Sequence, residues 1–202
     1  MGFKNLFFPG SASYWEKRYR KNGHSGTGSY GENATYKAQV LNDFVSRNSI
    51  KTVIEFGCGD GNQLKQFRFP GYIGLDVSLT AIKKCRDIFI NDPTKSFFLY
   101  DPAAFADHQA AFKADLSLSL DVIYHLIEEE VFENYMNHLF SSSGRFIIIY
   151  AWDVDGKRKH HVRHRQFTRW IEENVKGWHL VEKISNGKPE GACDFFIYEK
   201  GV

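Results

Sequence analysis

The sequence has 202 residues, 43% of them hydrophobic, and a formal net charge of +2 from 26 basic and 24 acidic residues. This length suffices to bury one substantial core, so we expect a single domain. The balanced charge argues against a general nucleic-acid binder, and three scattered cysteines without a C-x-x-C pair argue against disulfides and zinc. With no signal peptide or membrane-spanning apolar stretch in the sequence, we expect a cytoplasmic protein.

The first 35 residues differ in character from the expected core, residues 36–202. Residues 14–19 favour a short helix, and the glycine-rich run 23–31 must be a loop. Such an N-terminal segment is either a lid over a ligand site or a solvated arm, and the sequence leaves both open. Tyr30, in this loop, is a candidate substrate-binding residue.

A glycine-rich turn follows the first predicted strand. A helix expected over residues 36–45 leads to a strand beginning near Thr52, and the apolar run 53–56 ends in glycines at 57, 59 and 61. Because glycine allows positive φ and close approach of the backbone, such a turn is typical of a nucleotide pocket. Asn62 replaces the third glycine of the dinucleotide fingerprint, and no Gly-Lys-Ser/Thr loop occurs, which disfavours NAD and ATP. A turn without a ligand is the alternative.

Acidic residues end the next two predicted strands. After a short helix with Leu64 and Phe67 inward, the strand 72–76 ends on Asp76, 19 residues beyond Gly57. This is close to the interval of about 20 residues at which an acid binds ribose hydroxyls, so we interpret Asp76 as a ribose ligand, with a helix cap as the alternative. A helix over 78–89 follows, with Ser78 as its N-cap, Cys85 in the core, and Leu79 and Ile88 also on its apolar side. The third strand, 97–100, precedes Asp101, which is alternatively a turn residue.

The second half continues the alternation of strands and helices. A period-two strand starts at Asp115 and runs on to Leu126, and a helix opened by Glu128, Glu129 and Glu130 follows it. We then expect a central strand over 145–152, a helix over 166–175, and two closing strands over 178–184 and 194–199. This order predicts an α/β fold, a mostly parallel sheet with helices on both faces and an antiparallel C-terminal strand pair.

Four segments in order, Glu55–Gly61, Asp76, Asp101 and Ser119–Leu126, resemble the motifs of class I S-adenosylmethionine-dependent methyltransferases, of the small-molecule type. The resemblance implies their seven-stranded Rossmann-like fold, with S-adenosylmethionine at the carboxyl ends of the strands. It also implies that Glu55 faces the cofactor's ammonium and Asp101 its adenine amino group. Further cofactor contacts are expected from Gly57, Cys58, Gly59, Val77, Pro102, Ser119 and Leu120.

S-adenosylmethionine is already activated, so the protein needs only to align an acceptor and remove a proton from it. His125 is the first candidate base because imidazole accepts protons near neutral pH, and His161 and His164 are the second candidates. Arg163 and Arg165 belong to a basic run, 157–165, and are predicted to bind an anionic acceptor; a solvated surface is the alternative. No metal site is expected.

The acceptor is less well defined by the sequence. Residues 163–171 resemble a segment of bacterial methyltransferases encoded beside sugar-modifying enzymes, which favours O-methylation of a small molecule, carbohydrate or sugar nucleotide. Neither an Asn/Asp-Pro-Pro-aromatic tetrapeptide nor a cysteine placed for cytosine C5 methylation occurs, so a nucleic-acid acceptor is disfavoured. The alternative function is a non-catalytic cofactor-binding or regulatory module with the same fold.

Overall fold

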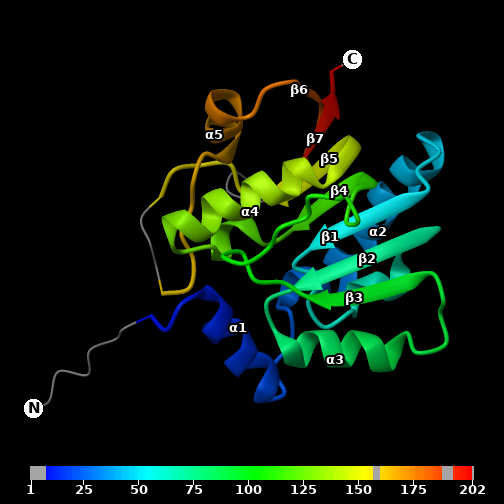
Figure 1. The fold of residues 1–202 in the computed structure, drawn as a ribbon, viewed down its shortest axis with the longest axis vertical. Coiled ribbons are helices and arrows are strands. Elements are labelled where there is room, and N and C mark those ends of the chain that lie inside the picture. Colours follow the sequence, from blue (N-terminus) through cyan, green and yellow to red (C-terminus); the bar gives the residue numbers. More distant parts are fainter. Residues whose placement is uncertain (1–7, 157–159, 188–192, 202) are drawn as a thin grey trace, which may run out of the picture.

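The computed structural model describes residues 8–156, 160–187 and 193–201. Its centre is a seven-stranded sheet in the order β3-β2-β1-β4-β5-β7-β6 (Figure 1). Strands β1 to β5 pair in parallel, and β7 is antiparallel to both β5 and β6. The predicted α/β fold with an antiparallel C-terminal pair is therefore confirmed. The strands are β1 Thr52–Phe56, β2 Gly71–Asp76, β3 Lys95–Leu99, β4 Ala114–Leu120, β5 Ser143–Ala151, β6 Trp178–Ile184 and β7 Asp194–Lys200.

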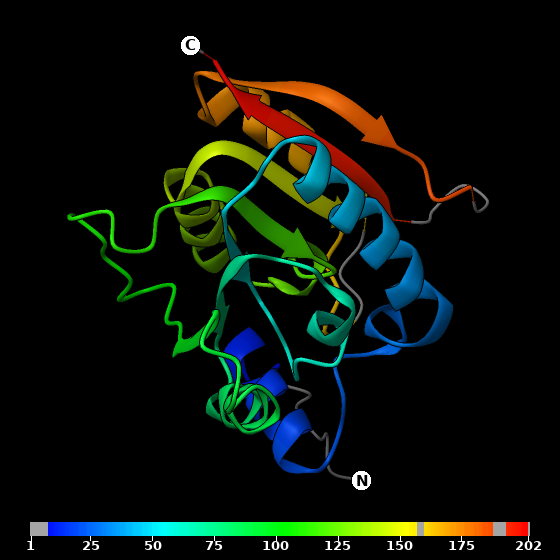
Figure 2. The same cartoon turned by 90° about the vertical axis from the view of Figure 1, so that its right-hand side faces the viewer.

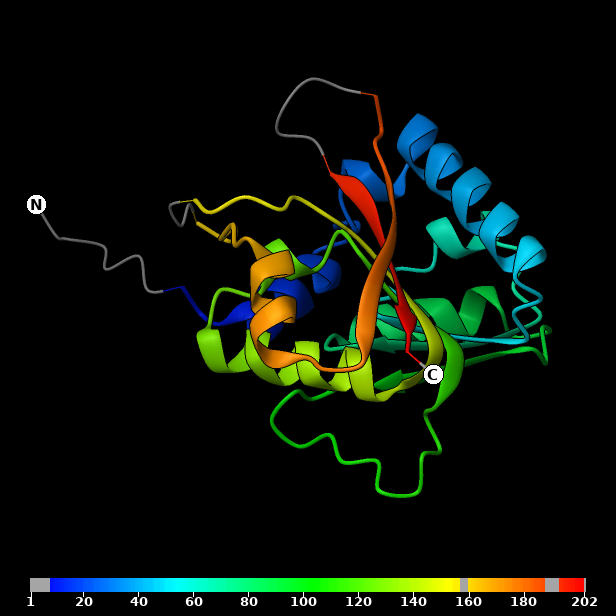
Figure 3. The ribbon, with the colours of Figure 1, turned by 90° about the horizontal axis from the view of Figure 1, so that it is seen from above.

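Helices cover both faces of this sheet, because the strands are apolar on both sides. Leu41 of α2 packs with Leu64 in one core, and Phe132 of α4 packs with Phe167 of α5 in the other. Figure 3 shows α4 and α5 on the side opposite α2. The helices are α1 Ser11–Arg20, α2 Gly31–Arg47, α3 Leu79–Ile88, α4 Glu129–Ser141 and α5 Phe167–Asn174, and the 3-10 turns are η1 Thr27–Ser29, η2 Gln63–Gln66 and η3 Ile123–His125.

The predicted N-terminal helix is present as α1. It lies beside α3 (Figure 2), near the carboxyl ends of β1 to β3. The predicted N-cap of α3 is also confirmed, since the Ser78 hydroxyl accepts the Ala81 N–H at 3.1 Å. Cys85 is fully buried, as expected. Within the described ranges, no helix combines the length and apolar character needed to cross a membrane.

Some predicted boundaries were wrong. The helix expected after the glycine turn is only the single turn η2, because Pro70 follows it closely and the next strand begins at Gly71. Strand β4 ends at Leu120 instead of continuing to 126, because Asp121 takes a positive φ of 61° that a strand does not allow. Leu79 and Ile88, expected to face inward, are exposed.

Candidate active-site cavity

A cavity of about 220 Å³ opens at the carboxyl ends of the central strands. Its floor consists of the segments that follow β1, β2, β3 and β4, which the parallel topology brings to one edge of the sheet. The N-terminal helix α1 contributes Ser11, Trp15 and Tyr19 to its wall. The cavity therefore joins segments separated by more than a hundred residues in the sequence.

The glycine turn after β1 forms one wall of the cavity, and its shape requires glycine. Gly57 has φ 87°, and a Cβ there would lie 2.5 Å from a methyl carbon of Val122. Gly59 has φ 62°, and a Cβ there would lie 2.4 Å from Ser25 Oγ. The N–H of Gly59 donates to the Asp76 carboxylate at 2.9 Å, which ties the turn to the end of β2. Larger residues would therefore reshape this wall.

The three predicted cofactor-binding acids all line this cavity. Glu55 is buried and accepts a hydrogen bond from the Tyr72 hydroxyl at 2.6 Å; burial raises the pKa of Glu55 to about 7. Asp76 accepts the N–H groups of Gly59 and Ser78, and burial raises its pKa to about 6. Asp101 is exposed at the rim, where its carboxylate accepts the Ala103 N–H at 2.9 Å.

Most other predicted cofactor contacts lie in the same cavity, namely Gly57, Cys58, Gly59, Val77, Pro102 and Leu120. Ser119 does not. It is fully buried in β4, and its hydroxyl is hydrogen-bonded to the Tyr135 hydroxyl of α4 at 2.7 Å. Its side chain is therefore part of the packing between the sheet and α4.

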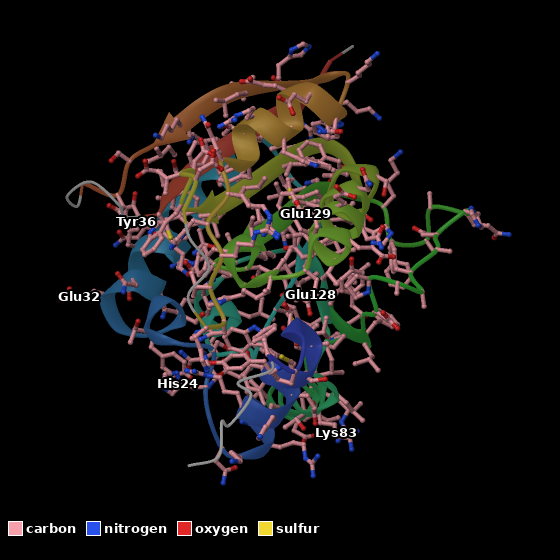
Figure 4. All side chains as sticks on the ribbon, turned by 90° about the vertical axis from the view of Figure 1, so that its left-hand side faces the viewer. His24, Glu32, Tyr36, Lys83, Glu128 and Glu129 are labelled. Atoms are coloured by element: carbon pink, nitrogen blue, oxygen red, sulfur yellow. The ribbon has the colours of Figure 1, made fainter. Side chains whose placement is uncertain are left out.

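Two carboxylates hold α1 over the cavity, and no sequence pattern predicts either contact. Glu16 of α1 accepts hydrogen bonds from the hydroxyls of Ser78 and Thr80 at 2.6 and 2.7 Å. At the other end of α1, the Ser11 hydroxyl donates to Glu128 at 2.6 Å. Figure 4 shows Glu128 between α1 and α4. The helix is thus held at both ends.

The loop before α2 also closes on the glycine turn. The Asp60 carboxylate accepts the Ser25 N–H at 3.0 Å and the Tyr30 hydroxyl at 2.8 Å. Tyr30, a predicted substrate-binding residue, does not line the cavity; its ring packs against His24 at a centroid distance of 4.9 Å. Its hydroxyl instead helps to hold the loop against Asp60.

Of the three candidate histidines, only His125 lines the cavity. Its Nδ1 lies 3.0 Å from the carbonyl oxygen of His161, and because a carbonyl only accepts, Nδ1 carries the hydrogen and Nε2 the lone pair. Burial lowers the pKa of His125 to about 4. The His161 ring stacks between His125 and Tyr14, whereas the His164 ring stacks on Trp152 with centroids 4.3 Å apart.

The two candidate arginines are bound to protein groups away from the cavity. Arg165 donates to the carbonyl oxygens of Leu126 and Ile127 at 2.6 and 3.2 Å, and Arg163 donates to Ile127 at 3.1 Å. Both also pair with Glu129, the first residue of α4 (Figure 4). They fasten the segment between η3 and α4. Residues 157–159 of the same basic run lie outside the described residues.

A mostly buried ion pair beside the cavity is not predicted by the sequence patterns. Lys37 of α2 has no exposed surface, and its Nζ lies 2.5 Å from Oδ2 of Asp121, which lines the cavity. The Tyr124 hydroxyl donates to Oδ1 of the same carboxylate at 2.9 Å. The available signal was the position of Lys37 four residues before the core residue Leu41, on the apolar side of its helix.

Comparison with protein-family models and with curated proteins finds no match. Among solved structures, the N-methyltransferase NodS from Bradyrhizobium japonicum WM9, in complex with S-adenosyl-L-homocysteine, is similar with a TM-score of 0.72 and 16% identity over 96% of this chain and 100% of that chain. Magnesium protoporphyrin IX methyltransferase (ChlM) from Synechocystis PCC 6803 with bound SAH has a TM-score of 0.68 and 14% identity, covering 94% and 98%.

The methyltransferase domain of bacterial CtHen1-C is similar with a TM-score of 0.64 and 19% identity, covering 82% of this chain and 97% of that chain. Identities this low establish the architecture and leave the acceptor open. The strand order, the antiparallel β7 and these likenesses agree with the resemblance found in the sequence. The chain therefore has the fold of the class I S-adenosylmethionine-dependent methyltransferases.

Proposed function

We propose that this protein is an S-adenosylmethionine-dependent methyltransferase. The observation that carries the proposal is that one cavity is lined by the glycine turn, by Asp76 and by Asp101, the three groups that the sequence resemblance assigns to one cofactor. Their order along the sheet edge, from β1 to β2 to β3, matches the amino acid, ribose and adenine parts of an extended nucleoside ligand.

The donor and acceptor chemistry of these residues fits the cofactor. Glu55 is a carboxylate for the ammonium group, and the backbone N–H groups of the glycine turn suit the cofactor's carboxylate. Asp76 accepts from the ribose hydroxyls, and Asp101 from the adenine amino group. Val77 and Pro102 offer apolar surface beside these two acids.

When bound, the cofactor supplies a methyl group already activated on its sulfonium. The protein then has to hold an acceptor in line with that methyl and keep water away, for which α1 is placed as a lid over the cavity. His125 is the proposed proton acceptor, through Nε2. His161 supports it by accepting the Nδ1 hydrogen at its carbonyl oxygen.

We propose a small molecule, carbohydrate or sugar nucleotide as the acceptor, methylated on oxygen. The narrow cavity under α1 supports a small acceptor group. The similar solved structures include an N-methyltransferase, a magnesium protoporphyrin IX methyltransferase and a small RNA methyltransferase, so they do not favour one acceptor class. Nucleic acid is disfavoured because Arg163 and Arg165 are bound to the protein itself.

Isothermal titration calorimetry with S-adenosyl-L-homocysteine tests this proposal. We expect micromolar or tighter binding, weakened about tenfold or more by Asp101→Asn, which loses a charge-assisted hydrogen bond. Glu173→Gln, at an exposed carboxylate of α5 outside the cavity, is the matched control and should bind like the wild type. No binding to the wild type would refute the proposal, and binding without methyl transfer to any acceptor of a broad panel would favour a non-catalytic module.

A further inference from the structure

The charged side chains that line the cavity are almost all acidic. Among the described residues there are six carboxylates in its wall and no lysine or arginine: Glu55, Asp60, Asp76, Asp101, Asp121 and Glu128. On the proposed function, on which this inference rests, Glu55, Asp76 and Asp101 bind the cofactor. The side of the cavity left for the acceptor then holds carboxylates and the uncharged His125.

The cations near this side are already bound to protein groups, and Arg18 donates to the main-chain carbonyl of His24 at 2.7 Å. Arg163 and Arg165 pair with Glu129 and donate to main-chain carbonyls. Lys37 is fully buried behind Asp121 and donates to its carboxylate. In the part of the chain that the structure describes, no cation in the cavity wall remains to bind a phosphate or carboxylate of an acceptor.

Asp121 is the carboxylate best placed to meet the acceptor. It directly follows β4, and β4 lies beside β1 in the sheet, so Asp121 is adjacent to the glycine turn, where a Cβ on Gly57 would touch its neighbour Val122. Its side chain is 14% exposed and lines the cavity. A group bound there would be close to the methyl group of a cofactor seated on that turn.

The Asp121 carboxylate is rigidly held but not saturated. Its backbone has φ 61°, and its N–H donates to the Tyr150 carbonyl at 2.9 Å. Lys37 donates to Oδ2, Tyr124 and, at 3.6 Å, the Cys193 thiol donate to Oδ1, and Gly28 packs so closely that a Cβ there would lie 2.5 Å from Oδ2. Because an ionised carboxylate accepts about four hydrogen bonds, capacity remains for a donor from a ligand. A strained backbone kept at a binding site is typical of functional residues.

A second polar group in the cavity wall has an oxygen that no described residue reaches with a hydrogen bond. Gln63 lines the cavity and is 7% exposed, and its Oε1 is buried with no hydrogen-bond partner among the described residues. A buried oxygen without a donor is costly, so the ligand that fills this cavity should bring one. We therefore expect a ligand of this cavity to donate hydrogen bonds from O–H or N–H groups to Gln63 and Asp121.

We propose that the acceptor is an uncharged or cationic molecule that donates an O–H or N–H hydrogen bond to the Asp121 carboxylate, and that anionic acceptors are rejected. Of the acceptor classes proposed above, this excludes the sugar nucleotides, and it admits an amine beside a hydroxyl. In the reaction, a lone pair of the acceptor oxygen or nitrogen forms a bond to the methyl carbon as the bond from carbon to sulfur breaks. The displaced electron pair stays on sulfur. A hydroxyl that is methylated passes its proton to His125 Nε2 and then to solvent, while a neighbouring O–H or N–H of the acceptor stays hydrogen-bonded to Asp121. An amine acceptor has a second hydrogen for Asp121 and releases its extra proton to solvent.

Two cofactor analogues test this without knowledge of the acceptor. In sinefungin an amine-bearing carbon replaces the sulfonium, which places a cation where the acceptor must approach; the carboxymethyl sulfonium analogue places an anion near the same point. We expect the wild type to prefer sinefungin to S-adenosyl-L-homocysteine and to bind the carboxymethyl analogue least. Asp121→Asn should weaken the binding of sinefungin about tenfold and the binding of S-adenosyl-L-homocysteine by less than about threefold. Asparagine tolerates the left-handed backbone, so the variant keeps its local shape.

Asp101→Asn is the matched control, because it should weaken all three ligands by the same factor through their shared adenosine. If Asp121→Asn does not fold, as judged by circular dichroism, Tyr124→Phe removes the hydroxyl that orients Oδ1 and should reduce only the preference for sinefungin. Equal losses of affinity for all three ligands in these variants would overturn this inference and leave the proposed function standing. A wild type that prefers the anionic analogue would do the same. A wild type that binds none of the three overturns the proposed function with it.

The two kinds of donor are distinguished by transfer of a tritiated methyl group to matched sugars. Methylation of a 2-amino sugar in preference to its parent sugar identifies an amine acceptor, and the reverse identifies a hydroxyl. Preferential methylation of the 6-phosphorylated sugar would contradict the charge of the cavity and overturn the inference.

Discussion

Replacing Lys37 by methionine removes the cation of a buried ion pair and leaves most of its volume in place. The Nζ group has no exposed surface and lies 2.5 Å from Asp121, whose side chain is 14% exposed. Breaking such a pair by removing one partner costs about 3–5 kcal/mol, because the remaining charge stays buried. Tyr124 still donates to the carboxylate, so we expect Lys37→Met to lower the free energy of unfolding by about 3 kcal/mol.

For a chain of this length, 1 kcal/mol corresponds to about 2–4 °C, so Lys37→Met should lower the melting temperature by about 6–12 °C. Thermal and urea unfolding followed by circular dichroism measure this. Lys51→Met, at an exposed position, is the control and should change stability by less than about 0.5 kcal/mol.

A double-mutant cycle with Asp121→Asn separates the pair from other effects of each change. Because the two side chains touch, the double variant should lose less free energy of unfolding than the two single variants lose together, by about 1 kcal/mol or more. Additive losses, or a Lys37→Met variant as stable as Lys51→Met, would refute the interpretation of Lys37 as the partner that stabilises the Asp121 carboxylate.

Three further predictions concern the pH dependence and the basic loop. Burial raises the pKa of Glu55 to about 7. The stabilising effect of Glu55 on the unliganded fold is therefore present below its unfolded pKa and is lost as pH rises through about 7. Binding of S-adenosyl-L-homocysteine at pH 7 should release a proton from Glu55, so the calorimetric enthalpy should depend on the ionisation enthalpy of the buffer, and Glu55→Gln should abolish this dependence. Burial lowers the pKa of His125 to about 4, so methyl transfer should weaken only below about pH 5. A loss centred at about pH 6.5 that His125→Phe removes would contradict the lowering of this pKa by burial. Arg165→Met loses the hydrogen bonds to Leu126 and Ile127 and should lower the free energy of unfolding in urea by about 2–3 kcal/mol. Unchanged stability with a selective loss of binding to an anionic acceptor would instead support the prediction that Arg165 binds such an acceptor.

The strands and the cofactor-side residues were predictable because local patterns determine them. Apolar runs interrupted by glycine and acidic residues mark where each parallel strand ends, and the topology brings all those ends to one edge of the sheet. This is why Gly57, Asp76 and Asp101 line one cavity. Ser119 does not, because its side chain is directed to the Tyr135 hydroxyl of α4.

Contacts between distant segments were not predictable from local patterns. Glu16 binds Ser78 across 62 residues, and Lys37 binds Asp121 across 84. Helical spacing indicates that Lys37 lies on an apolar side, but the partner that neutralises it is known only from the fold. The partners of Arg165 were not predictable for a related reason, since the groups that bind it are main-chain carbonyls, which carry no sequence signal.

A crystal structure with S-adenosyl-L-homocysteine bound would show directly whether this cavity is the cofactor site. We expect adenine beside Asp101, the ribose hydroxyls on Asp76, the amino acid end between Glu55 and the glycine turn, and the sulfur facing Asp121. α1 should cover the ligand with the Glu16 contacts intact. A ligand bound elsewhere would contradict the proposed cofactor site, and a sulfur that faces away from Asp121 would contradict the role of Asp121 toward the acceptor.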